Sequence, residues 1–164
     1  MPNPFLTKTL PPDAPFCDRQ EELAALLGHA ESGANAVLFS PRRYGKTSLV
    51  FRVQHQLAGR GILPVYVDLF AVDSALDAAA KIARAALAAL HARESLLGKG
   101  KRLLRHFTSF RPVFKPAEDG FDLTVEMARE DPLDLLGRVL AELGAFADRT
   151  GQRFNVALDE FQEV

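Results

Sequence analysis

The stretch Val37–Val50, VLFSPRRYGKTSLV, decides the fold because it changes from one hydrophobic pattern to another. Its first residues belong to the apolar run 35–40, NAVLFS, which has the length of a buried strand. After the loop, apolar side chains return with the spacing of one helical face: Leu49, Val50, Val53 and Leu57. The stretch therefore predicts a strand, a loop and a helix, with the helix ending at the GRG sequence of 59–61.

The loop of this stretch ends in Gly45, Lys46 and Thr47, the last three positions of the phosphate-binding pattern G-x-x-x-x-G-K-[ST]. A loop whose backbone N–H groups converge before a helix N-terminus supplies the donors that a triphosphate needs. In that scheme, Lys46 reaches the outer phosphates and the Thr47 hydroxyl binds Mg²⁺. Ser40 replaces the first glycine of the pattern, which is tolerable because close approach to phosphate depends more on Gly45 and the amides after it.

Three neighbours in the same block belong to the candidate nucleotide site: Arg43, Tyr44 and Ser48. Arg43, like Arg42 beside it, either contacts phosphate or a neighbouring subunit, or is a solvated charge on the loop face. A plainer interpretation of the block is a strand-to-helix turn in which Gly45 gives backbone freedom and Lys46 is a solvated charge. The position between an apolar strand and an amphipathic helix favours the phosphate loop.

Residues 154–160, FNVALDE, end an apolar strand with the adjacent carboxylates Asp159 and Glu160. The carboxyl ends of parallel strands lie on the ligand side of a sheet, which predicts that Asp159 lies near the phosphate loop. We expect Asp159 to support Mg²⁺, usually through water, and Glu160 to orient or deprotonate the attacking water. For an isolated pair of acids a solvated strand end would be the simpler account, so this prediction depends on the loop.

Two segments before and after the loop have clear patterns. Residues 18–33 predict a helix, with Asp18 as N-cap and Glu21 in the capping-box position. Residues 62–70, ILPVYVDLF, are β-branched and aromatic, and they predict a second buried strand.

Two longer helices complete the alternation of strands and helices. One starts at Ser74, and its expected core face consists of Leu76, Ala80, Ala83, Leu87 and Leu90. The other runs from Asp131 and Pro132 to Gly151, and its expected core face consists of Leu133, Leu136, Leu140 and Leu143. This alternation predicts the α/β class, with a parallel sheet covered by helices on both faces.

Residues 98–130 interrupt the alternation. Two short arms, 111–115 and 121–126, flank a turn at Asp119 and Gly120, which predicts an inserted β-hairpin. The part before the turn is basic, with Lys99, Lys101, Arg102, Arg105, Arg111 and Lys115. These charges either contact nucleic acid through its phosphates or are solvated hairpin charges, and the lack of stacked aromatic spacing favours the second interpretation.

Three motifs together resemble the archaeal-type ATPase family of P-loop proteins, which is placed among the STAND and AAA-like ATPases. FCDRQEEL at 16–23 resembles F-x-G-R-x-x-E-L, SPRRYGKTSLV at 40–50 resembles GPRR-x-GKTSL, and VALDEFQEV at 156–164 resembles hhhhDEFQ-x-h. The resemblance implies that ATP and Mg²⁺ are the cofactors and that the segment 16–23 flanks adenine. Arg19 then either has a role at the base or is an exposed charge, because Asp18 replaces the glycine that precedes this arginine in the family.

The resemblance also implies a three-layer αβα fold of the ASCE type, with strand order 5-1-4-3-2 and an inserted hairpin. In that order the strand after Glu160 lies between the phosphate-loop strand and the strand of Asp159. Because the sequence stops at Val164, we expect a partial ATPase domain, 18–164, after an irregular arm, 1–17, and poor ATP hydrolysis by these residues alone. Filling of the open sheet position by another chain is a further hypothesis.

Composition limits the remaining functional classes. A net charge of −1 gives no global attraction to nucleic acid or to an anionic membrane. No apolar run approaches the length of a membrane span, and the single cysteine and the N-terminal sequence favour a cytoplasmic setting. We therefore expect an ATP- and Mg²⁺-binding ATPase module, the nucleotide-dependent switch of a larger regulatory protein. The alternatives are a nucleotide-binding scaffold without useful turnover and a DNA-associated motor or loader of the AAA type.

Overall fold

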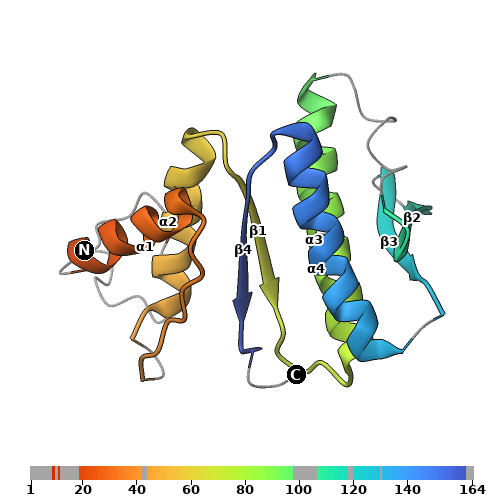
Figure 1. Cartoon of the computed structure of the whole chain (residues 1–164), viewed down its shortest axis with the longest axis horizontal. Helices are drawn as coiled ribbons and strands as arrows, with labels where there is room; N and C mark the ends of the chain where they lie inside the picture. The colour runs from red at the N-terminus through yellow and green to blue at the C-terminus, as the bar shows by residue number, and fades with distance from the viewer. Residues whose placement is uncertain are drawn as a thin grey trace. The chain divides into compact units, whose positions relative to one another are not determined.

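The computed structural model describes residues 9, 11, 19–41, 44–97, 107–117, 120–129 and 131–161. Within these residues the protein is of the α/β class, with four helices, a small parallel sheet and an antiparallel pair (Figure 1). In chain order the elements are α1 Gln20–Ser32, α2 Lys46–Gly59, β1 Leu63–Asp68, α3 Ala75–Leu97, β2 Phe110–Ala117, β3 Gly120–Met127, α4 Pro132–Thr150 and β4 Phe154–Asp159. The chain divides into two compact units, Met1–Pro64 and Val65–Val164.

The first unit is built on the packing of α1 against α2. Helical spacing gives each helix one apolar face, and the two faces bury a common cluster. The cluster consists of Leu23, Leu27, Leu49, Val53, Leu57 and Ile62. The predicted helix of the phosphate-loop block is confirmed, because α2 begins at Lys46 and ends at Gly59.

The strand predicted at 35–40 is wrong, because residues 34–41 have no strand structure. Val37 is 77% exposed and Phe39 is 88% exposed, while Leu38 packs against the cluster of the first unit. An extended apolar segment becomes a strand only when its backbone groups pair with a neighbouring strand. In the described part of the chain the sheets are β1 with β4 and β2 with β3, so the segment 35–40 has no ladder partner there.

The start of α1 differs from the prediction by one residue. Arg19 is the N-cap, and its carbonyl oxygen accepts the first helical hydrogen bond, from the Leu23 amide at 3.1 Å. The predicted N-cap Asp18 lies outside the described residues. At the other end, Gly33 adopts a left-handed conformation (φ 75°) and closes the helix where the sequence predicted.

The second unit places α3 beside α4, and the hairpin of β2 and β3 packs against α3 (Figure 1). The strands β1 and β4 form the parallel pair, and the Leu69 amide donates a hydrogen bond of 3.0 Å to the Asp159 carbonyl oxygen just beyond the end of β1. Aromatic rings connect α4 to β4 and to the segment that precedes β2. The ring centre of Phe146 lies 5.5 Å from that of Phe107 and 5.9 Å from that of Phe154.

The limits of α4 agree with the prediction, but its predicted core face is correct only at Leu143. The Asp131 carboxylate caps the helix by accepting hydrogen bonds from the amides of Leu133 and Asp134, and Gly151 ends it in a left-handed conformation. The buried residues of the helix are Leu135, Val139, Leu143 and Phe146. Leu133, predicted for the core, is 72% exposed. Leucines occupy two faces of this helix, and contact with the aromatic cluster selects the face that carries Phe146.

The predicted core face of α3 also needs a correction at its first residue. Leu76 is exposed and burial begins at Ala78 and Ala79, while Ala80, also predicted for the core, is half-buried. Ala83, Leu87 and Leu90 are buried as predicted. Small alanine side chains permit close approach of a neighbouring helix, which agrees with the burial of Ala78, Ala79 and Ala83.

The inserted hairpin is confirmed, with antiparallel pairing from Phe110 opposite Met127 to Ala117 opposite Gly120. Gly120 is therefore the first paired residue of β3, and the two residues between the strands, 118–119, lie outside the described residues. The Glu142 carboxylate of α4 accepts hydrogen bonds from the amides of Thr108 and Ser109 at 3.0 and 3.1 Å. This contact fixes the base of the hairpin to α4.

Candidate functional site

The candidate phosphate loop meets α2 at Gly45, which is the N-cap of the helix and has a φ of 71°. This left-handed conformation is easy for glycine and costly for residues with a Cβ atom. A Cβ atom at Gly45 would meet nothing within 4 Å, so the backbone angle, and not lack of space, requires the glycine. No side chain among the described residues caps α2, and its first turn contains no acid. The backbone amides of this helix end therefore suit an anion.

Lys46 bends back over the loop that precedes it. Its ammonium nitrogen donates a hydrogen bond of 3.0 Å to the Ser40 carbonyl oxygen and a longer one of 3.5 Å to the Pro41 carbonyl oxygen. Among the described residues, the positive charge is thus held beside the first turn of α2 by these two backbone carbonyl oxygens. Phosphate oxygens would offer an ammonium group stronger, charge-assisted partners than these neutral carbonyls.

Arg19 connects the start of α1 to the candidate loop. Its guanidinium donates to the Tyr44 carbonyl oxygen at 2.7 Å and to the Glu22 carboxylate at 3.1 Å. The sequence allowed two interpretations of Arg19, a contact with the nucleotide base or an exposed charge. The hydrogen bond to Tyr44 indicates a third role, in which Arg19 braces the loop by fixing it to the start of α1. The side chain of Tyr44 itself is exposed.

The other loop residues differ in burial. Thr47 is half-buried and Ser48 is buried in the first turn of α2. Arg43 and its neighbour Arg42 lie outside the described residues, so their predicted contacts stay predictions.

The candidate carboxylates lie at the carboxyl end of β4, as predicted. One oxygen of the Asp159 side chain accepts a hydrogen bond of 2.8 Å from the Tyr66 hydroxyl, and the other accepts one of 3.1 Å from the Glu160 amide. Glu160 has a φ of 54°, a conformation that costs a residue other than glycine about 1–3 kcal/mol and concentrates at functional sites. The strained residue is thus the one for which the sequence predicts a role in activating water.

The two halves of the candidate site belong to different units. Lys46 and Thr47 are in the first unit, whereas Asp159 and Glu160 are in the second. Each half is supported by its own geometry. No cluster of three or more His, Cys, Asp or Glu side chains that could hold a metal occurs in the described residues. Mg²⁺ commonly takes only one or two protein ligands and completes its shell with water and substrate phosphates, and the Thr47 hydroxyl and the Asp159 carboxylate each carry an oxygen of the kind that Mg²⁺ prefers.

Two hydrogen-bonding residues of the second unit were not predicted from the sequence. Tyr66 contacts Asp159, and Glu142 holds the hairpin base. A signal for Tyr66 is present in the strand sequence, because a tyrosine among buried aliphatic residues needs a partner for its hydroxyl. Nothing in the sequence near Glu142 indicates a partner about thirty residues earlier in the chain.

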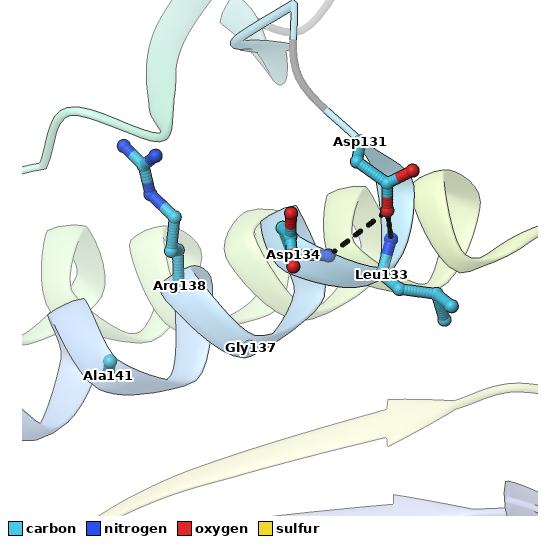
Figure 2. Close-up of a pocket in the computed structure, with 6 residues that line it drawn as sticks. All are labelled: Asp131, Leu133, Asp134, Gly137, Arg138 and Ala141. Atoms are coloured by element: carbon cyan, nitrogen blue, oxygen red, sulfur yellow. Dashed lines mark hydrogen bonds between the residues drawn. The ribbon is translucent and has the colours of Figure 1, made fainter.

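Other predicted or possible sites gain no support from the geometry. Of the basic residues in 98–115, Arg111 and Lys115 are described and lie opposite Glu126 and Asp122 in the hairpin, while 98–106 lie outside the described residues. A surface hollow on α4 is lined by Asp131, Leu133, Asp134, Gly137, Arg138 and Ala141 (Figure 2). Figure 2 shows the Asp131 carboxylate turned to the amides of its own helix, which explains this acid as a cap.

Within the described part of the chain, none of the helices combines the length and the apolar character that crossing a membrane requires. Comparisons of the chain with protein-family models, with curated proteins and with solved structures gave no match.

Proposed function

We propose that this chain is an ATP- and Mg²⁺-binding P-loop ATPase module that serves as the nucleotide-dependent switch of a larger cytoplasmic protein. The observation that carries the proposal is the junction of loop and α2. Gly45 enters the helix in a left-handed conformation, and the next residue, Lys46, directs its ammonium group back to the Ser40 carbonyl. A helix N-terminus and a nearby cation form an anion site of the kind that nucleotide phosphates use.

Each candidate residue has a separate role in this proposal. The amides from Gly45 to Ser48 and the ammonium of Lys46 bind phosphate, and Arg19 and Tyr44 shape the loop. The Thr47 hydroxyl and the Asp159 carboxylate hold Mg²⁺, which neutralises charge on the phosphates. Glu160 orients the attacking water. The proposed fold is the three-layer αβα arrangement of P-loop proteins.

Titration with ATP tests phosphate binding directly. We expect Lys46→Ala to weaken ATP binding about 10–100-fold, because hydrogen bonds to a charged group contribute about 1.5–3 kcal/mol. Lys81→Ala is the matched control, because Lys81 also donates from its ammonium to a backbone carbonyl, that of Phe70 at 3.2 Å, but lies on α3. Equal affinities of the wild type and Lys46→Ala would refute the phosphate-loop assignment.

A second measurement separates the ATPase from the scaffold alternative. Glu160→Gln keeps the size of the side chain and removes its charge, so we expect it to bind ATP normally and to lose turnover in the full-length protein. If the wild type and Glu160→Gln turn over at the same slow rate, the protein is a nucleotide-binding scaffold. Stimulation of the wild-type rate by DNA would favour the motor alternative. Light scattering across concentrations would test self-association of the chain.

A further inference from the structure

Tyr66 lies in the middle of β1, next to the strand that carries the candidate metal ligand. Residues Leu63, Val65 and Val67 of β1 are buried, and Tyr66 alternates with them, so its ring projects from the opposite face of the strand. From that face the hydroxyl donates a hydrogen bond of 2.8 Å to Asp159 across the parallel pair. This distance is the normal one for a hydroxyl donor and an oxygen acceptor.

Asp159 is held at three points by this arrangement. Its carbonyl oxygen accepts from the Leu69 amide at 3.0 Å, which fixes the backbone to the chain following β1. Of its two carboxylate oxygens, one accepts from Tyr66 and the other from the Glu160 amide. The backbone bond fixes the Cα position, and the two side-chain bonds fix the rotation of the carboxylate plane. All of these residues belong to the second unit.

We propose that Tyr66 is a positioning residue that orients the Asp159 carboxylate to bind the Mg²⁺ ion that accompanies the nucleotide. This inference rests on the proposed function. Groups that hydrogen-bond to a metal ligand fix its orientation, and their loss typically lowers metal affinity or activity about 10–100-fold. A carboxylate oxygen has more than one lone pair, so donation by the phenol is compatible with acceptance from a metal-bound water. The hydroxyl of Tyr66 acts through Asp159 and does not contact the metal.

A purely structural role for the hydroxyl makes a different prediction. If Tyr66 donates only because a half-buried hydroxyl requires a partner, its removal changes stability and leaves the response to Mg²⁺ untouched. The informative quantity is therefore the Mg²⁺ gain, defined as the dissociation constant of a non-hydrolysable ATP analogue in EDTA divided by that in saturating Mg²⁺.

The test measures the Mg²⁺ gain for the wild type, Tyr66→Phe, Asp159→Asn and the double variant. We expect Tyr66→Phe to leave the affinity in EDTA unchanged and to reduce the Mg²⁺ gain about 10-fold. In the Asp159→Asn background the same change should have no further effect, because the two residues act as one unit. Thr124→Val is the matched control, since it also removes a part-buried hydroxyl that donates within the second unit, to the Val113 carbonyl oxygen.

Two outcomes overturn the inference. The first is that Tyr66→Phe keeps the wild-type Mg²⁺ gain, whether its affinity is unchanged or falls by the same factor in EDTA and in Mg²⁺. The second is that the effect of Tyr66→Phe is undiminished in the Asp159→Asn background. Failure of the proposed function has a separate signature, because then the wild type would not bind the analogue, or Lys46→Ala would bind it equally well. Thermal unfolding of each variant verifies that the comparison is made on folded protein.

Discussion

The ammonium nitrogen of Lys46 lies 3.0 Å from the carbonyl oxygen of Ser40, and this contact joins the two ends of the candidate phosphate loop. The contact uses the backbone of Ser40, so the side chain at this position has no part in it. Serine at position 40, where the phosphate-binding pattern has its first glycine, is therefore compatible with this contact.

Replacing Ser40 by glycine tests this interpretation. We expect Ser40→Gly to change the ATP dissociation constant by no more than about twofold, equivalent to about 0.5 kcal/mol. Isothermal titration of the variant beside the wild type measures the change. A large gain in affinity would mean that the serine side chain obstructs the site.

Gly45 and Gly28 predict opposite effects of the same substitution. Gly45→Ala forces alanine into a left-handed conformation and should lower the free energy of unfolding by about 1–2 kcal/mol. Gly28 lies inside α1, where alanine is preferred, so Gly28→Ala should raise that free energy by about 0.5–1 kcal/mol. An added Cβ meets nothing within 4 Å at either position. Urea denaturation would contradict the assignment if both variants shifted in the same direction.

Leu135 and Leu133 test which face of α4 is buried. Leu135 is 0% exposed, so Leu135→Ala leaves a cavity and should cost about 2–5 kcal/mol of stability. Leu133 is exposed, and Leu133→Ala should change stability by about 0.5 kcal/mol or less. Thermal or urea unfolding of the two variants measures the difference. Similar losses at both positions would show that Leu133 is buried in solution.

Glu142 should be important for stability although it is not fully buried. Glu142→Ala leaves the amides of Thr108 and Ser109 without their carboxylate partner, and hydrogen bonds to a charged group contribute about 1.5–3 kcal/mol. Asp148→Ala is the control on the same helix, and we expect a change of about 0.5 kcal/mol or less because this acid is exposed. Hydrogen exchange of the hairpin amides should rise in Glu142→Ala alone, and unchanged protection would exclude the proposed anchor.

The sequence predicted several elements with their ends because local chemistry defines those ends. Asp131 caps α4 through its own side chain, and Gly151 closes it with a backbone conformation that glycine adopts easily. The pairing of β2 with β3 was predicted for the same reason, since a short turn between two strand-forming segments fixes the register. These features depend on residues close together in the chain.

The predictions failed where the structure depends on contacts between residues that are far apart in the chain. The run 35–40 has a strand-forming composition, yet it has no ladder partner in the described chain and leaves Phe39 exposed. The leucines of α4 lie on two faces, and the periodicity gave no basis for choosing the face of Leu135 over that of Leu133.

By itself the sequence predicted the helices, the hairpin and the strands at 63–68 and 154–159, together with the glycine at the loop and the candidate residues Lys46, Thr47, Asp159 and Glu160. These depend on backbone conformation, spacing and side-chain chemistry, all of which are local. Only the tertiary structure decided which helix faces are buried, that Arg19 braces the loop, and that Tyr66 holds Asp159. The physical reason is that burial and hydrogen bonding between distant segments depend on which surfaces meet, and a linear pattern does not contain that choice.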